Sequence, residues 1–293
     1  MLTIESVSKR FTGGNYGVRD LSLSVKGGVL GLLGSNGAGK TTLMQMIATI
    51  TKPTAGRITF DGVDAIKHPD DLRNRLGYLP QDFGVYENLT AYEFLSYFAA
   101  LKGVRSRTRV QEMLEMVNLH AVASRAVGGF SGGMKQRLGI AQALINNPDL
   151  VIVDEPTAGL DPEERVRFRN VLSDLGLGRL VILSTHIVSD IESIATEIAI
   201  MKQGTLIRHA APEELLRDAT GSVWELVLAS DQFDAVRRTL HVSSAVRKAD
   251  GVHARVVAAE LPAPHARAVE PTLEDAFLFT MSGASPARSE AVA

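Results

Sequence analysis

The sequence predicts an α/β fold with two kinds of β-sheet, an inserted helical subdomain and a small α+β appendage at its C-terminal end. Three observations support this prediction. Unbroken apolar runs alternate with helical patterns, which is typical of strands covered on both faces of a parallel sheet. Other segments alternate apolar and polar residues, the period of half-buried antiparallel strands. Between about residues 82 and 147, helical patterns follow one another without a convincing strand.

The composition is that of an ordinary globular chain. Of the 293 residues, 45% are hydrophobic and 22% are charged, the formal net charge is −2, and cysteine is absent. A chain of this length has room for about two domains. Because basic residues are not in excess, we expect no binding to nucleic acid. The longest uncharged stretch, between Lys26 and Lys40, is too short to cross a bilayer, so we expect no direct membrane insertion.

The two strand patterns fall on separate segments. The alternating pattern occurs in Leu2–Ile4, Leu21–Val25 and Ile58–Phe60. The unbroken apolar runs are Val29–Leu33, Leu150–Val153 and Leu180–Leu183. We therefore expect an antiparallel layer beside a parallel sheet.

The end of the helical subdomain is marked clearly. Apolar residues recur at steps of three and four, and so share one face of a helix, at Met134, Leu138, Ala141 and Ile145. Asn147-Pro148 ends this helix because the residue before a proline disfavours the helical conformation. Asp161-Pro162 opens another helix, since a proline in the first turn sacrifices no hydrogen bond. Residues 198–207 have the pattern of a hairpin.

The composition of the sequence changes near Thr220. The pattern predicts a strand at Val223–Leu228, a short helix at Phe233–Leu240 and a second strand at Val252–Val257. A proline-rich linker is predicted at Pro262-Ala263-Pro264. We expect a first domain over 1–219, which includes the helical subdomain at about 82–147. An α+β domain over 220–282 and a disordered tail over 283–293 follow.

The segment from Gly34 to Thr42 fits the phosphate-binding pattern G-x-x-x-x-G-K-[ST] and lies between a strand and a helix, as this motif requires. Glycines can turn several backbone N–H groups toward one anion, and the start of the helix adds more donors. The sequence therefore predicts a P-loop NTPase core. The residues expected to contact the phosphates are Gly34, Asn36, Gly37, Gly39, Lys40, Thr41 and Thr42.

Two carboxylates, Asp154 and Glu155, end the apolar run that begins at Leu150. An acid at such a strand end can hold Mg²⁺ through its water shell, and the next one can direct the water that attacks a γ-phosphate. The pair indicates hydrolysis of a nucleoside triphosphate.

A second anion site is predicted at Ser131-Gly132-Gly133. Ser131 caps a helix, and the two glycines leave its first N–H groups uncovered. Two anion sites for one triphosphate suggest a sandwich, in which Ser131 and Gly133 of one protomer meet the nucleotide on the phosphate loop of the other.

With these motifs in this order, the chain resembles the ATP-binding-cassette (ABC) family of transporter ATPases over roughly residues 1–215. The resemblance implies ATP and Mg²⁺ as cofactors. Gln81 looks like the glutamine that senses Mg²⁺ and contacts the membrane subunit, and His186 looks like the γ-phosphate switch histidine. Ser131-Gly132-Gly133 resembles the family signature, and Ala158–Asp161 the loop that crosses the dimer interface. The implied site is Glu155, His186 and Gln81 for catalysis, Asp161 with the nucleotide, and Thr41, Gln81 and Asp154 with the metal.

Two further details follow from the resemblance. An aromatic residue near the N-terminus stacks on adenine in the family, and we assign this role to Phe11, with Tyr16 as the second choice. Met134 stands where glutamine is commoner, which puts in doubt any polar role at that position. Hydrolysis should survive this change.

The C-terminal segment refines the class. Glu270–Phe277 looks like the closing motif of ATPase subunits from the exporter subgroup for drugs, antibiotics and polysaccharides. We expect a homodimer, or a pairing with another ATPase subunit, at the cytoplasmic face of the membrane. A separate transmembrane permease would dock on the aromatic segment Asp82–Tyr97. The alternatives are a cytosolic ATP-driven switch that moves no solute, and a P-loop kinase, which does not explain Ser131-Gly132-Gly133.

Overall fold

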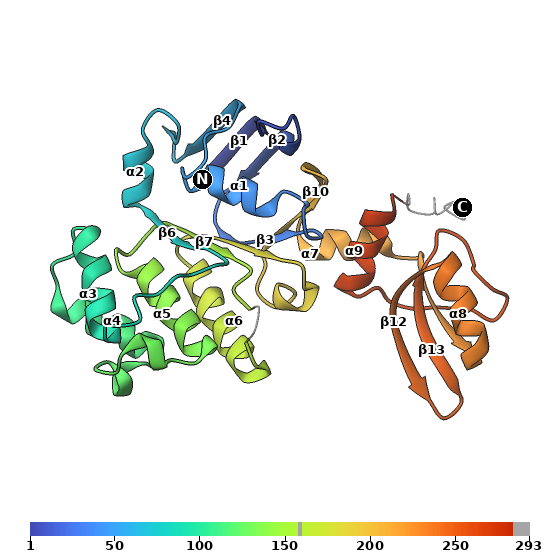
Figure 1. The fold of residues 1–293 in the computed structure, drawn as a ribbon. Helices are drawn as coiled ribbons and strands as arrows, with labels where there is room; N and C mark the ends of the chain where they lie inside the picture. Colours follow the sequence, from blue (N-terminus) through green and yellow to red (C-terminus); the bar gives the residue numbers. More distant parts are fainter. Residues whose placement is uncertain (158–159, 284–293) are drawn as a thin grey trace. The chain divides into compact units, whose positions relative to one another are not determined.

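The computed structural model describes residues 1–157 and 160–283 and divides the chain into two compact units, Met1–Leu206 and the residues from Ile207 onward. Figure 1 shows the order of the elements along the chain. The domain bounds expected from the sequence stay a prediction. Of the tail over 283–293, only Gly283 lies within the described residues.

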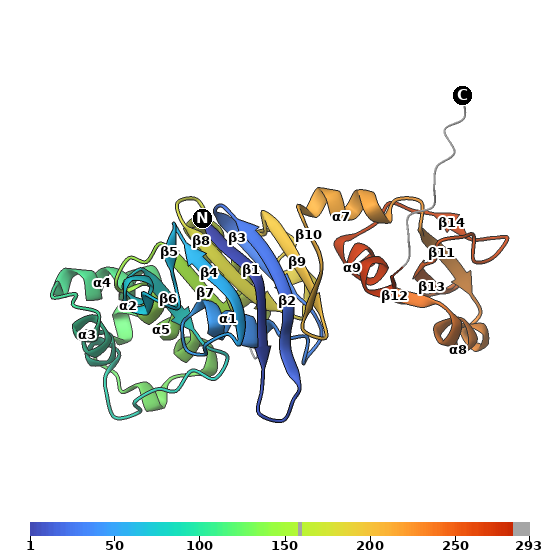
Figure 2. The ribbon, with the colours of Figure 1, turned by 90° about the horizontal axis from the view of Figure 1, so that it is seen from above.

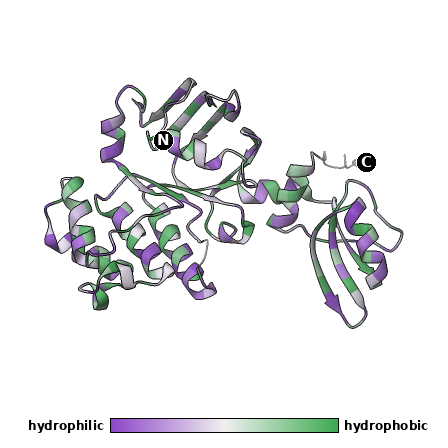
Figure 3. Cartoon of the chain, viewed as in Figure 1, coloured by the Kyte–Doolittle hydropathy of each residue, from purple (hydrophilic) through white to green (hydrophobic). Residues whose placement is uncertain are grey.

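The first unit is built on a six-stranded sheet in the order β10-β9-β3-β8-β7-β6. The pairs β3/β8, β3/β9, β7/β8 and β6/β7 are parallel. As expected from their unbroken apolar sequences, β7 and β8 are buried along their whole length, and Figure 3 shows the hydrophobic residues along this sheet. The strands are β3 (Gly28–Leu33), β6 (Leu76–Leu79), β7 (Leu150–Asp154), β8 (Leu180–Thr185), β9 (Glu197–Lys202) and β10 (Thr205–Ala210).

A second, antiparallel sheet has the order β2-β1-β4-β5. Its strands are β1 (Leu2–Arg10), β2 (Tyr16–Val25), β4 (Ala55–Phe60) and β5 (Val63–Asp64). Helix α1 (Lys40–Ile47) lies between the two sheets (Figure 2). Leu2, Leu43 and Leu32 belong to one hydrophobic core, so α1 joins the layers. This arrangement fixes the start of α1 at the end of β3.

Helices make up the subdomain after β6, as predicted. Thr90 and Glu93 form a reciprocal capping box at the start of α3, and Phe94 is fully buried whereas Tyr86 is 54% exposed. The short helix α2 was not predicted. Besides α1, the helical elements of the first unit are α2 (Pro69–Asn74), α3 (Ala91–Leu101), α4 (Arg107–Met116), η1 (His120–Val122), η2 (Val127–Gly129), α5 (Gly132–Leu144), α6 (Pro162–Gly176) and η3 (Val188–Asp190).

The second unit has an antiparallel sheet in the order β12-β13-β11-β14. The predicted strands at β11 and β13 and the helix at α8 are present, and the proline-rich segment at Pro262 lies inside this unit. The edge strand β12 was not predicted, because much of it is exposed and it lacks a clear apolar period. The elements are α7 (Pro212–Ala219), β11 (Val223–Leu228), α8 (Ser230–Thr239), β12 (His241–Lys248), β13 (Gly251–Val257), β14 (Arg267–Ala268) and α9 (Leu273–Ser282).

None of the helices in the described ranges combines the length and the apolar character that crossing a membrane requires.

Candidate functional site

The phosphate loop connects β3 to α1, and its backbone explains its glycines. Gly37 and Gly39 have φ angles of +80° and +100°, a region that side chains with a Cβ rarely adopt. A Cβ on Gly39 would lie 2.2 Å from the carbonyl oxygen of Gly17. No side chain caps the start of α1. Its first N–H groups therefore remain available to an anion.

Lys40 is the first residue of α1 and only 5% exposed. Its Nζ donates to the carbonyl oxygen of Gly34 at 2.7 Å and lies 3.5 Å from Oε1 of Glu155. The ammonium group is thus held between the loop and the acid that directly follows β7, where it can reach a phosphate on the loop.

A cleft of about 330 Å³ lies over the loop. Its volume is in the range of roughly 300–1,000 Å³ that is usual for small-molecule sites. The structure brings together here most of the residues predicted from three distant parts of the sequence. The cleft is lined by Gly17, Asn36, Gly37, Ala38, Gly39, Lys40, Thr41, Thr42, Gln81 and Glu155. Gly17 was not predicted, because it belongs to no phosphate motif.

Asp154 is the last residue of β7 and 1% exposed. Its Oδ1 accepts a hydrogen bond from the Ser184 hydroxyl, whereas Oδ2 is buried and has no hydrogen-bond partner among the described residues. Burial, and then the negative charge of Asp154, raise the pKa of Tyr78 to about 12. A carboxylate oxygen left free in a buried position, with Thr41 and Gln81 lining the adjacent cleft, fits a hard cation such as Mg²⁺.

Glu155 adopts a strained backbone conformation, with φ at +48°. Its N–H donates to the carbonyl oxygen and to the hydroxyl of Ser184, at 3.2 and 3.1 Å. Its Oε2 lies 2.6 Å from Nδ1 of His186. The carboxylate thus lies between an ammonium group and an imidazole at the edge of the cleft, which suits a general base. Ser184 was missed because a buried serine in an apolar strand gives no sequence signal.

The predicted signature residues lie elsewhere. Ser131 and Asp161 cap the starts of α5 and α6, and their side chains accept from the backbone N–H groups of Met134 and Glu164 at 3.2 and 2.8 Å. Neither they nor Gly133 lines the phosphate cleft. Of the predicted dimer loop Ala158–Asp161, residues 158 and 159 lie outside the described residues.

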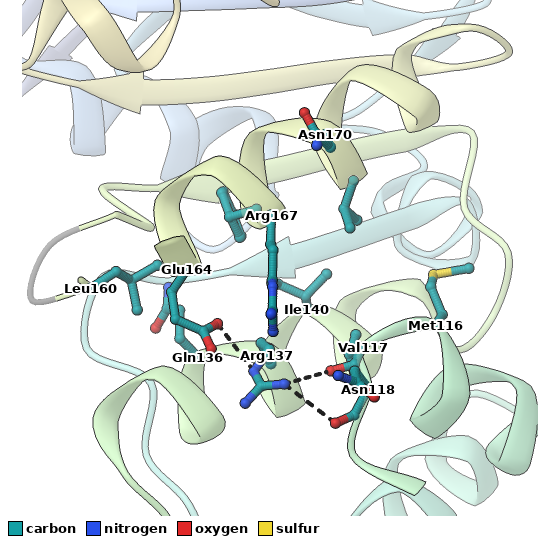
Figure 4. Close-up of a pocket in the computed structure, with 12 residues that line it drawn as sticks. Met116, Val117, Asn118, Gln136, Arg137, Ile140, Leu160, Glu164, Arg167 and Asn170 are labelled. Atoms are coloured by element: carbon teal, nitrogen blue, oxygen red, sulfur yellow. Dashed lines mark hydrogen bonds and ion pairs between the residues drawn. The ribbon is translucent and has the colours of Figure 1, made fainter. Parts of the chain in front are cut away.

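An ion pair joins the second turn of α5 to the first turn of α6 (Figure 4). Nε of Arg137 lies 3.3 Å from Oε2 of Glu164, and its Nη1 donates to the carbonyl oxygens of Val117 and Asn118 at 3.2 and 3.3 Å. A Cβ on Gly133 would lie only 3.6 Å from the side chains of Leu160 and Glu164. A cavity of about 270 Å³ lies beside this pair. The N-terminal parts of α5 and α6, where Ser131 and Asp161 are the caps, therefore contact each other.

The two aromatic candidates for adenine differ in their surroundings. Phe11 is 48% exposed, and its ring lies against Gly17, where a Cβ would come within 2.7 Å of it and 2.9 Å of Thr42. Tyr16 instead has the guanidinium groups of Arg19 and Arg10 over its ring, at 4.6 and 5.8 Å. Phe11 thus lies beside a cleft-lining residue and next to Thr42.

The fold and the cleft define a nucleotide-binding protein with a phosphate loop, and the comparisons identify its family. The profile described as ABC transporter matches residues 18–158. The chain is 38% identical to the ABC transporter ATP-binding protein NatA of Bacillus subtilis, over 73% of this chain and 91% of NatA. It is 36% identical to the Nod factor export ATP-binding protein I of Burkholderia orbicola, over 75% of this chain and 74% of that protein.

Among solved structures, a dimeric post-hydrolysis state of the ATP-binding cassette MJ0796, bound to ADP and Pi, matches with a TM-score of 0.67 at 27% identity. The match covers 72% of this chain and 98% of that one. The chain belongs to the ABC transporter family and is a homologue of its ATP-binding subunits.

Proposed function

We propose that this chain hydrolyses ATP as the energising subunit of an ABC exporter with a separate membrane permease. One observation carries the proposal. Glu155 borders the phosphate cleft, with His186 2.6 Å from one carboxylate oxygen and Lys40 3.5 Å from the other. An acid held in this way can orient and deprotonate a water molecule for attack on a γ-phosphate.

The other cleft residues supply binding. The N–H groups from Gly34 to Thr42 and the Lys40 ammonium would hold the phosphates, and Phe11 would stack on the base. Mg²⁺ would be held by Thr41, Gln81 and, through water, Asp154. When bound, it would neutralise charge on the β- and γ-phosphate oxygens.

A second protomer would complete the site. Ser131 and Gly133 present the start of a capped helix outside the cleft of their own chain, which suits a nucleotide held by the partner. Asp161, at the start of α6, is tied to that helix through Glu164 and Arg137. The dimeric cassette with ADP and Pi among the solved structures supports this arrangement.

The permease would dock beside α3, at the cytoplasmic face of the membrane. A cleft of about 600 Å³ is lined there by Val85, Tyr86, Glu87, Asn88, Leu89 and Tyr97. Tyr86 and Tyr97 are 54% and 45% exposed, and their rings pack edge to face at 5.6 Å. Such exposed aromatic surface suits a protein partner. Export of an unidentified solute is supported by the Nod factor export relative and by the tail at Glu270–Phe277.

The decisive variant is Glu155→Gln, which keeps the shape of the side chain but removes the base. We expect ATP turnover to fall at least ~100-fold, the scale for loss of a general base. The protein should then accumulate as an ATP-bound dimer in solution scattering. Glu163→Gln is the matched control, because Glu163 is an exposed acid on α6. Near-normal turnover of Glu155→Gln would remove Glu155 from this role.

Purification from detergent-solubilised membranes tests the coupling to transport. A multi-span membrane protein that copurifies in equal amount supports an exporter. A soluble complex in the same yield would favour an ATP-driven switch that moves no solute.

A further inference from the structure

Asp190 is a buried acid that the mechanism above does not use. It ends the short turn η3, which begins two residues after His186, and only 2% of it is exposed. Its N–H donates to the carbonyl oxygen of Ile187 at 3.2 Å, which ties the residue to the segment that carries His186. A buried carboxylate is costly unless it is hydrogen-bonded, so its partners define what it does.

Those partners are hydroxyl groups from two separate segments. The hydroxyl of Thr157, itself 2% exposed, donates to Oδ2 of Asp190 at 2.5 Å. The hydroxyl of Thr185 lies 3.5 Å from the same oxygen and accepts from the N–H of Ile187 at 2.9 Å. One carboxylate therefore joins the chain after β7 to the chain after β8.

Each segment carries one member of the Glu155–His186 pair. Thr157 follows Glu155 by two residues, and Thr185 directly precedes His186. The side chains of Glu155 and His186 meet at 2.6 Å, on the same two segments that Asp190 joins. The two segments are thus joined by two contacts, the partly buried contact between Glu155 and His186 and the buried hydrogen bond from Thr157 to Asp190.

We propose that Thr157 and Asp190 form a positioning pair that holds Glu155 against His186 during ATP hydrolysis. The proposal rests on the function proposed above. Neither residue lines the phosphate cleft, so the pair acts through Glu155 and not on the nucleotide. Its loss should therefore lower kcat and leave nucleotide binding nearly unchanged.

The first test is Thr157→Val, which keeps the volume of the side chain and removes the donor. We expect kcat to fall ~10- to 100-fold, since a misplacement of about 1 Å can cost on the order of 100-fold. The KM for ATP should change by less than about twofold, because ground-state binding is retained. Thr157→Ser, which keeps the hydroxyl, should restore most of the rate. Asp190→Ala, which removes the acceptor, should resemble Thr157→Val.

Two double variants separate positioning from general destabilisation. If the pair acts as a unit, Thr157→Val combined with Asp190→Ala should be no slower than the slower single variant. If it acts through Glu155, adding Thr157→Val to Glu155→Gln should cost no further activity, as measured by single-turnover hydrolysis of radiolabelled ATP.

Thr196→Val provides the structural control. Its hydroxyl accepts from the N–H and donates to the carbonyl oxygen of Val29, both at 3.1 Å, at the start of β3. This variant should lower the Tm without lowering kcat.

Wild-type protein that turned over no ATP would overturn the proposed function and this proposal together. With an active wild type, three results would overturn the positioning pair alone. These are a kcat for Thr157→Val within about twofold of wild type, an equal further loss in the Glu155→Gln background, and failure of Thr157→Ser to recover the rate.

Discussion

Buried acids in the two units differ in how completely their oxygens are bonded. In the first unit, Asp154 has one carboxylate oxygen without a hydrogen-bond partner in the part of the chain that the structure describes, and Glu155 has a strained φ of +48°. In the second unit, the side chain of Asp275 is 0% exposed and accepts from Arg255, Ser243 and Thr272. The acid with an unbonded oxygen and the acid with a strained backbone lie next to each other beside the cleft, whereas the fully bonded acid anchors a helix.

This difference distinguishes acids that suit a functional role from an acid that stabilises the fold. A buried polar atom without a partner and a strained backbone are retained where a ligand or a reaction uses them. The bonds to Asp275 instead form a capping box with Thr272 at the start of α9 and attach this helix to β12 and β13. The closing motif at Glu270–Phe277 therefore has a structural role within this unit. Substitutions should affect the two sites differently.

The largest effect on stability is expected from Asp275→Ala. It leaves the partly buried guanidinium of Arg255 and the hydroxyl groups of Ser243 and Thr272 without their acceptor, so the free energy of unfolding of the second unit should fall by about 3 kcal/mol. ATP turnover of the folded protein should remain. Trp224 on β11 is the sole tryptophan, so its fluorescence during urea unfolding reports on this unit directly.

Glu274→Ala is the matched control, because Glu274 is the exposed neighbour of Asp275 on α9. It should change the free energy of unfolding by no more than about 0.5 kcal/mol. Equal losses in both variants would show that the bonds to Asp275 are not the anchor.

Much of the fold could be predicted because its signals are local. Apolar runs identified β3, β7 and β8, and the Asp161-Pro162 and Ser131-Gly132-Gly133 motifs identified two helix starts. The edge strand β12 and the short helix α2 carry no such period and were missed. An exposed edge has no buried face to impose alternation on its residues.

The residues of the candidate site also differ in whether a local sequence signal indicates them. The phosphate loop, Asp154 and Glu155 are contiguous motifs, and the sequence alone indicates their chemistry. The hydrogen bonds of Ser184 and Asp190 join segments that lie far apart in sequence, and no spacing reveals them. Which aromatic residue faces the base was also undecided, because exposed rings near a strand end look alike until their neighbours are known.

An effect of intermediate size, on the affinity for Mg·ATP, is expected from Phe11→Ala. This variant applies the comparison of free and bonded groups to two aromatic rings. The ring of Tyr16 is covered by Arg19 and Arg10, whereas Lys9 alone among the described residues lies within cation–π distance of the Phe11 ring, at 5.8 Å. Phe11→Ala should weaken Mg·ATP binding by about 1–3 kcal/mol, the range for stacking of a base on an aromatic side chain. Calorimetric titration of the Glu155→Gln protein measures this binding without turnover.

Tyr16→Ala should change this affinity by no more than about 0.5 kcal/mol, and Phe11→Tyr should bind ATP as wild type does, since either ring can stack. A larger loss for Tyr16→Ala than for Phe11→Ala would transfer the stacking role to Tyr16.

The smallest effect is the pH dependence that Asp275 gives to the second unit. Burial raises the pKa of this carboxyl, but the hydrogen bonds from Arg255, Ser243 and Thr272 outweigh burial and hold the pKa below its ordinary value of 3.8. An acid whose pKa is lower in the folded state stabilises that state above the unfolded pKa. This contribution is lost as the pH falls through the folded pKa. The difference in free energy of unfolding between wild type and Asp275→Asn should therefore be constant from neutral pH down to about pH 4 and shrink below it. Urea unfolding followed by Trp224 at a series of pH values measures this difference, and a constant difference into the acid range would show that the Asp275 carboxylate contributes no stability through its charge.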